Sequence, residues 1–121
     1  EHYFQAQKFP DTEHEDNIRQ ANSPMLAKRM GNSRKYPLRK DWESVKDAVM
    51  FEAVLAKFEQ HKELQDILLA TGEAKLAEHT ERDSYWGDGG DGKGKNRLGQ
   101  ILMRVRKHLR SRTASSTTVD K

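Results

Sequence analysis

The chain has 121 residues and a mass of 14.0 kDa, and its 34% hydrophobic and 34% charged residues predict one domain with a modest core and a well-solvated surface. The 22 basic and 19 acidic residues leave a net charge of +3, which by itself is too small to indicate nucleic-acid binding. The lack of cysteine excludes disulfides, thiolate zinc sites and cysteine nucleophiles, and no apolar run approaches membrane-spanning length. We therefore expect a cytoplasmic protein with no membrane partner.

The opening segment, residues 1–9, has no β-branched residue and is followed by a proline, so it predicts a helix. At about 100° per residue, Gln5 and Lys8 lie close to Glu1 on the helix surface, and most of the remaining surface is apolar. Such a polar stripe on a buried helix often lines a cavity. The pattern leaves open a surface helix whose Glu1 and Lys8 face water. Because no N-cap residue precedes Glu1, we expect an upstream segment to be missing.

Residues 11–20 are polar and predict an exposed helix or a loop. Ser23 and Pro24 predict the start of the next helix, since Ser accepts from free backbone N–H groups and Pro suits the first helical position. Gly31 is placed to end that helix in the left-handed conformation.

The longest predicted helix covers residues 42–61, with Asp41 as its cap and a wide apolar face that makes it the central core helix. A shorter helix follows at residues 61–70 and ends at Gly72. Residues 75–80 alternate weakly and predict a short strand. The expected fold class is therefore α+β: one mostly helical domain with a small sheet.

Residues 82–96 are the second unusual stretch, because six of the chain's eight glycines fall between Gly87 and Gly99. The glycines match both a dinucleotide fingerprint and the start of a P-loop, but neither match follows an apolar strand, so we expect no cofactor. A glycine-rich loop before a helix can still bind an anion through its backbone N–H groups, and Trp86 could stack on a planar ring. The alternative is a flexible hairpin with Trp86 packed in the core.

Asn96 can cap the last helix, whose apolar positions recur to Leu109 and whose basic residues near its end suit its own dipole. Residues 111–121 are rich in Ser and Thr and predict a disordered tail. The five histidines are scattered, with no spacing that makes a metal site, so we expect no metal.

Long motifs of this sequence resemble the NADAR (YbiA-like) family, in order and without large gaps from residue 1 to about residue 110, which we take as the domain. The resemblance rests on EHYFQAQKF at residues 1–9, SP at 23–24, RKDW at 39–42, LAEHT at 76–80, YWGDG at 85–89 and GKNRLG at 94–99. It implies a YbiA-like fold and an N-glycosidase that cleaves early riboflavin-pathway intermediates. These are phosphoribosylamino-pyrimidines, and the products are ribose 5-phosphate and the free base.

The residues suit that chemistry. Cleaving the bond builds positive charge on the sugar, which a carboxylate such as Glu1 can stabilise, or the carboxylate can activate water. An amine of lowered pKa, such as Lys8, can instead attack the anomeric carbon and form a Schiff base. We expect Glu1 and Lys8 as the catalytic pair, with Gln5 orienting them. The expected substrate-binding residues of the loop are Trp86, Gly87, Asp88 and Asn96.

Two alternatives remain open from sequence. Other members of the family remove ADP-ribose from guanine bases, so the partner could be ADP-ribosylated guanine in nucleic acid rather than a small ribosyl phosphate. A module that binds ADP-ribose or NAD without turnover is the second alternative. Release of free base separates an enzyme from such a module, and the oligomeric state is not predicted.

Overall fold

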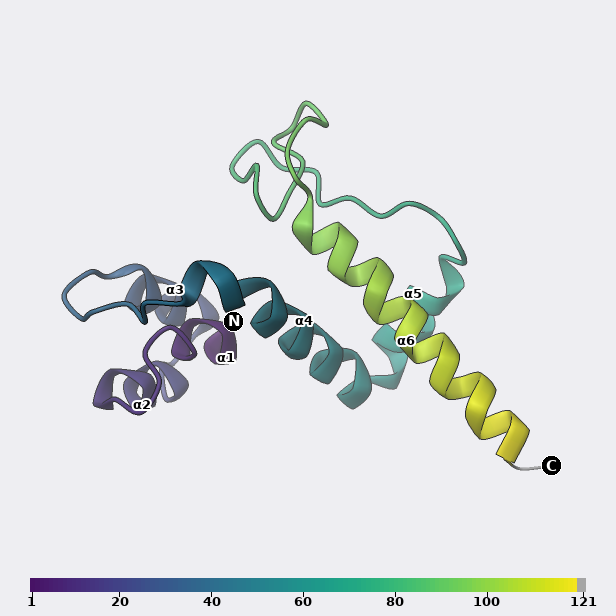
Figure 1. Ribbon diagram of the computed structural model, residues 1–121, viewed down its shortest axis with the longest axis horizontal. Helices are drawn as coiled ribbons and strands as arrows, with labels where there is room; N and C mark the ends of the chain where they lie inside the picture. The colour runs from purple at the N-terminus through teal and green to yellow at the C-terminus, as the bar shows by residue number, and fades with distance from the viewer. Residues whose placement is uncertain (120–121) are drawn as a thin grey trace. The chain divides into compact units, whose positions relative to one another are not determined.

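The computed structural model describes the backbone of residues 1–119 and the side chains of residues 1–112, and it is helical throughout its regular parts (Figure 1). The chain divides into two compact units, Glu1–Val49 and Met50–Lys121. None of the described helices is both long and apolar enough to cross a membrane. The helices are α1 (His2–Ala6), α2 (Glu13–Arg19), α3 (Pro24–Asn32), α4 (Trp42–Gln60), α5 (Lys62–Ala70) and α6 (Arg97–Val119).

The predicted α+β class is wrong for the described chain, which contains no strand, and residues 75–80 are extended but unpaired. Side chains and one backbone N–H, that of Asp88 to the carbonyl of Glu78 at 2.8 Å, bind their backbone groups in place of a neighbouring strand. The Asn96 side chain accepts from the N–H of Glu78 and donates to the carbonyl of Leu76, and the Asp88 carboxylate accepts from the N–H of Thr80. Because these bonds satisfy the groups a ladder would use, the segment is held straight without a sheet.

In the first unit, α1 packs against α2 and α3. α1 is shorter than predicted, since it ends at Ala6 and the chain continues in a tight turn. The N–H groups of Lys8 and Phe9 there donate to carbonyls three residues back, which is the 3₁₀ pattern common at helix ends. The turn directs Phe9 into the core. The buried residues of this core are Ala6, Phe9, Ile18 and Ala27.

The helix starts of the first unit follow the sequence rules. Ser23 caps α3 as predicted: its hydroxyl accepts from the N–H of Leu26 at 3.1 Å, and Pro24 is the first helical residue. Residues 11–20 resolve as a helix, α2, which Thr12 caps through the N–H of Glu15. The start of α3 was predicted from sequence, whereas the sequence left residues 11–20 as an exposed helix or a loop and named no cap there.

In the second unit, α5 packs against α6, and the long connection between them returns to the first turn of α6 (Figure 1). The predicted apolar positions of α6 are confirmed, because Ile101, Val105 and Leu109 are all buried with Leu68 of α5. Met50 to Phe58 of α4 supply partly buried side chains to the same core. Gly72 has φ +62°, as its predicted position at the end of α5 requires.

Basic residues of α6 stabilise the end of a different helix from the one predicted. The Arg106 guanidinium is buried and donates to the hydroxyl of Thr71 at 2.7 Å, and Arg110 donates to the carbonyl of Gly72 at 2.6 Å. Both acceptors lie just beyond α5, so the two cations lie at the C-terminal end of α5 rather than at that of α6. Arg110 binds a free carbonyl there, whereas the Thr71 hydroxyl that accepts from Arg106 donates in turn to the carbonyl of Leu68.

The backbone of α6 continues to Val119, through most of the predicted tail. Residues 120 and 121 of that tail lie outside the described residues, as do the side chains from residue 113 onward. The domain boundary near residue 110 stays a prediction.

Candidate functional site

Lys8 is a buried amine held among aromatic rings and two oxygen atoms. Its side chain is only 6% exposed, and its Nζ lies 5.8 Å from the ring centroid of Phe4 and 5.7 Å from that of Trp42. It donates to Oδ1 of Asn32 at 3.3 Å and to the carbonyl of Gly31 at 3.5 Å. All of these partners are neutral, so the amine has attractive contacts without a direct carboxylate partner.

Burial lowers the pKa of Lys8 from 10.5 to about 8, with smaller contributions from the positive charges of Arg34 and Lys46. The negative charge of Glu1 acts in the opposite direction. At neutral pH a useful fraction of this amine is therefore unprotonated, which a nucleophilic lysine needs.

Glu1 and Gln5 form the polar edge of the same helix. Gln5 is 4% exposed, and its Nε2 donates to Oε2 of Glu1 at 2.7 Å, while Glu1 itself is exposed. The Oε1 of Gln5 is buried and has no hydrogen-bond partner in the described structure. The predicted stripe is thus divided: Glu1 faces solvent, whereas Gln5 and Lys8 are enclosed.

Gly31 makes room for Gln5. A Cβ on Gly31 would lie 1.9 Å from Oε1 of Gln5, so no larger residue fits while Gln5 keeps its position. The sequence predicted Gly31 as a left-handed helix end, which is wrong: it lies inside α3 and is absent from the residues with positive φ. The physical reason for glycine here is the close approach of α1.

The glycine-rich loop of the second unit is organised by two aspartates. Oδ1 of Asp83 accepts from the N–H groups of Tyr85 at 2.9 Å and Trp86 at 2.7 Å, which closes a tight turn. Asp88 uses Oδ1 for the N–H groups of Thr80 and Gly90. These bonds belong to the loop itself, so both carboxylates shape the backbone.

The second oxygen of Asp88 is paired with His79. His79 Nδ1 lies 2.8 Å from Oδ2 of Asp88. This hydrogen bond lowers the pKa of the Asp88 carboxyl and raises the pKa of the exposed His79 imidazole. The pair therefore places a carboxylate with a charged imidazole at the surface of the loop at mildly acidic pH.

Asn96 and Gly87 join the two ends of the loop. Asn96 has φ +51°, and its N–H donates to the carbonyl of Gly87 at 2.9 Å. It precedes α6, but its side chain binds Leu76 and Glu78 instead of capping the helix. A Cβ on Gly87 would lie 2.8 Å from two backbone carbonyl oxygens, so that position requires glycine.

Trp86 is half-buried and packs on the core cluster that α5 and α6 form. Its ring meets that of Tyr85 edge-on at a centroid distance of 4.9 Å, and the ammonium of Lys95 lies 5.6 Å from the Tyr85 ring. The packing of Trp86 on the core agrees with one of the two alternatives that the sequence left open, and a stacking role for its ring stays a prediction.

Comparison with known proteins places the chain in a family, because a model described as the NADAR domain matches residues 1–110. The chain belongs to the NADAR family. It is 64% identical to "N-glycosidase YbiA" of Escherichia coli over 109 residues, which are 90% of this chain and 68% of that protein. It is 44% identical to "Riboflavin biosynthesis protein VVA0006" of Vibrio vulnificus over 109 residues, 90% of this chain and 30% of that protein. The NMR structure of E. coli YbiA matches with a TM-score of 0.87 at 61% identity, covering 93% of this chain and 67% of that one.

The site residues predicted for this NADAR domain fall into two local groups. In the first unit Glu1 and Gln5 share a hydrogen bond, and the charge of Glu1 acts on the pKa of Lys8 without a direct bond between them. The other group lies in the second unit, where backbone and side-chain hydrogen bonds hold its loop together. It consists of Trp86, Gly87, Asp88 and Asn96. That both groups serve one substrate stays a prediction.

Sequence reasoning missed three neighbours of these residues. Trp42 was assigned to the core and Asn32 to a connector, yet both contact Lys8 in the NADAR domain. His79 was counted among scattered histidines, although it pairs with Asp88. For Trp42 and His79 there was one signal in the sequence, because both lie within motifs shared with the family. That signal indicates a role in the site but does not say which residue each of them contacts. Among the described residues, no three His, Asp or Glu side chains converge into a metal-binding group.

Proposed function

We propose that this NADAR domain is an N-glycosidase whose substrates are phosphoribosylamino-pyrimidines of early riboflavin synthesis. The names of the relatives support the reaction class and the pathway. The observation that carries the mechanism is the buried Lys8 amine, with a pKa of about 8 and an acid–amide pair on the same segment. The products are ribose 5-phosphate and the free pyrimidine amine.

Lys8 acts as the nucleophile. An N-glycoside of an exocyclic amine can open its sugar ring to an imine at the anomeric carbon, and the Lys8 amine adds to that carbon. The carbon–nitrogen bond to the pyrimidine then breaks, the base leaves with a proton, and a Schiff base joins Lys8 to the sugar. Water adds to the Schiff base, which releases the sugar aldehyde and regenerates the amine. The net reaction consumes one water.

Glu1 moves the protons. Its exposed carboxylate can take the proton that the Lys8 nitrogen loses on adding to the carbon and pass it to the leaving nitrogen. The regenerated carboxylate can then take a proton from the incoming water. Gln5 holds Glu1 in position through its 2.7 Å hydrogen bond. The loop around Trp86 supplies a planar apolar surface for the pyrimidine.

Trapping with borohydride tests the proposal directly. We expect incubation with a phosphoribosylamino-pyrimidine and borohydride to add one reduced ribose phosphate to Lys8, located by mass spectrometry of peptides. Lys8→Met should lose both the adduct and base release by at least about 10³-fold, because the proposed mechanism passes through a covalent bond to the Lys8 amine. Lys35→Met is the control, since that exposed lysine lies in the same unit.

The same assay excludes the alternatives. Full base release by Lys8→Met would remove Lys8 from the mechanism, and saturable binding without released base would indicate a binding module. Release of ADP-ribose from modified guanine, with no action on the pyrimidine, would contradict the proposed substrate class.

A further inference from the structure

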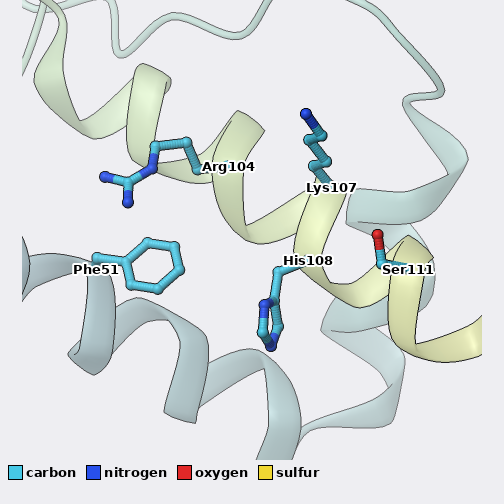
Figure 2. A pocket seen from close by; sticks show the side chains of 5 residues that line it. All are labelled: Phe51, Arg104, Lys107, His108 and Ser111. Carbon is cyan, nitrogen blue, oxygen red and sulfur yellow. The ribbon is translucent and has the colours of Figure 1, made fainter.

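A hollow of about 400 Å³ opens on the second unit between α4 and α6 (Figure 2). Its size lies within the range of small-molecule sites, about 300–1,000 Å³. Arg104 and His108 extend from α6 toward Phe51 of α4, and the hydroxyl of Ser111 lies at the far end (Figure 2). The lining residues are Phe51, Arg104, Lys107, His108 and Ser111.

The lining carries basic residues and no acidic one. Other arginines of α6 are already engaged: Arg106 with Thr71, Arg110 with Gly72, and Arg112 with Glu59. Within the described part of the chain, by contrast, no carboxylate pairs with Arg104 or Lys107. Arg104 and His108 therefore offer nitrogen donors beside Phe51 to a ligand that brings negative charge, while Lys107 extends away from Phe51 and adds its positive charge to the surroundings (Figure 2).

Phe51 fixes the position of the arginine. The Arg104 guanidinium carbon lies 4.6 Å from the centroid of the Phe51 ring, and the His108 ring meets the same ring edge-on at 6.5 Å. One face of Phe51 is thus covered by the guanidinium, so this face is closed to a stacked base. A guanidinium held in this way keeps its N–H edge free for a planar or tetrahedral anion.

We propose that this hollow binds the phosphate group of a small molecule. Arg104 supplies a two-pronged donor, Lys107 a point charge, and His108 and Ser111 further donors, which is the combination that phosphate oxygens require. The volume exceeds that of a phosphate alone and leaves room for the group that carries it. This site does not depend on the role proposed for Lys8.

Inorganic phosphate is the probe. We expect the whole chain to bind phosphate saturably at low ionic strength. The binding is monitored by NMR, and the amide and side-chain signals that shift should centre on residues 104–111. Arg104→Gln should weaken binding about tenfold or more, because it removes a charged, two-pronged hydrogen-bond donor from the hollow. Arg112→Gln removes the same charge from the same helix outside the hollow, and it should change the affinity less than twofold.

The source of the phosphate is decided by kinetics. If the group belongs to the substrate, Arg104→Gln raises KM for the phosphorylated pyrimidine riboside but leaves the dephosphorylated one unchanged, and phosphate competes with substrate. If it belongs to an effector, phosphate changes kcat without competing. Either result supports the site. Absence of binding to the native chain, or equal losses in Arg104→Gln and Arg112→Gln, overturns it as general surface charge.

Discussion

At the scale of single residues, the environment of Lys8 dominates the chemistry. The amine is enclosed by neutral groups, and positive charges at Arg34 and Lys46 oppose its protonation. Burial shifts its pKa down to about 8 from 10.5. Folding therefore disfavours the charged amine, so the burial that lowers the pKa of Lys8 also reduces stability at neutral pH.

The pKa of Lys8 predicts how stability depends on pH. Between about pH 8 and 10.5 the unfolded chain binds the Lys8 proton more fully than the folded one, so the free energy of unfolding should rise with pH. Lys8→Met lacks this amine, so its free energy of unfolding should not show this rise. The stability of the native chain relative to that of Lys8→Met should therefore increase over that pH interval. Urea unfolding at pH 7, 9 and 10.5 measures it, with Lys35→Met as the control. Parallel pH curves for the native chain and Lys8→Met would contradict a lowered pKa.

Gly31 predicts a steric effect. In Gly31→Ala the new methyl meets Oε1 of Gln5, so α1 and α3 must separate or Gln5 must move, at a cost of about 1–3 kcal/mol. Chemical unfolding of Gly31→Ala, Gln5→Ala and the double variant measures the coupling between the two sites. The double variant should lose less free energy of unfolding than the two single variants lose together. Simple additivity would show that Gln5 does not occupy that space.

At the scale of elements, side chains replace a sheet in the second unit. Asn96 and Asp88 bind the backbone of residues 76–80 and thereby join a straight segment to the loop that follows it. Neither of these two contacts repeats along the chain, so no periodic pattern in the sequence predicts them. The weak alternation of residues 75–80 resembled a strand because the backbone is extended, while the hydrogen-bonding partners are different.

Asn96 predicts the strength of this connection. Asn96→Gly keeps the left-handed backbone conformation accessible but removes both side-chain hydrogen bonds. The free energy of unfolding should fall by about 2 kcal/mol. Hydrogen exchange should then accelerate at the N–H of Glu78, which donates to Asn96. Exposed Asn22→Gly, in the first unit, is the control. Native protection at Glu78 in Asn96→Gly would mean that the bond is not formed.

At the scale of the whole molecule, the two predicted groups of site residues lie in different compact units. Each group is locally ordered by its own contacts, namely the Lys8 enclosure and the loop tied by Asp88 and Asn96. Under the proposed mechanism the first group would react with the sugar and the second would bind the base, and that both act on one substrate stays a prediction.

Fluorescence tests whether Trp86 faces the same substrate as Lys8. The chain has two tryptophans, so Trp42→Phe leaves Trp86 as the single indole emitter. In Trp42→Phe combined with Lys8→Met, substrate should bind without turnover, and its pyrimidine should quench Trp86 by stacking or energy transfer. Calorimetry on the same variant establishes saturation. Unchanged emission at saturating substrate would place the loop outside the site.

Sequence alone determined the Ser23 cap, the buried face of α6 and the resemblance to the NADAR family, because caps, periodicity and motifs are local or linear properties. It also located the start of α4 at Trp42, but the predicted cap Asp41 uses both carboxylate oxygens to bind Arg39. Only the tertiary structure showed that Lys8 is enclosed, that Gly31 accommodates Gln5, and that Arg106 stabilises the end of α5. These outcomes depend on groups that meet across long stretches of chain. Burial and a pKa are set by everything that surrounds a side chain, and a linear pattern records only its neighbours in order.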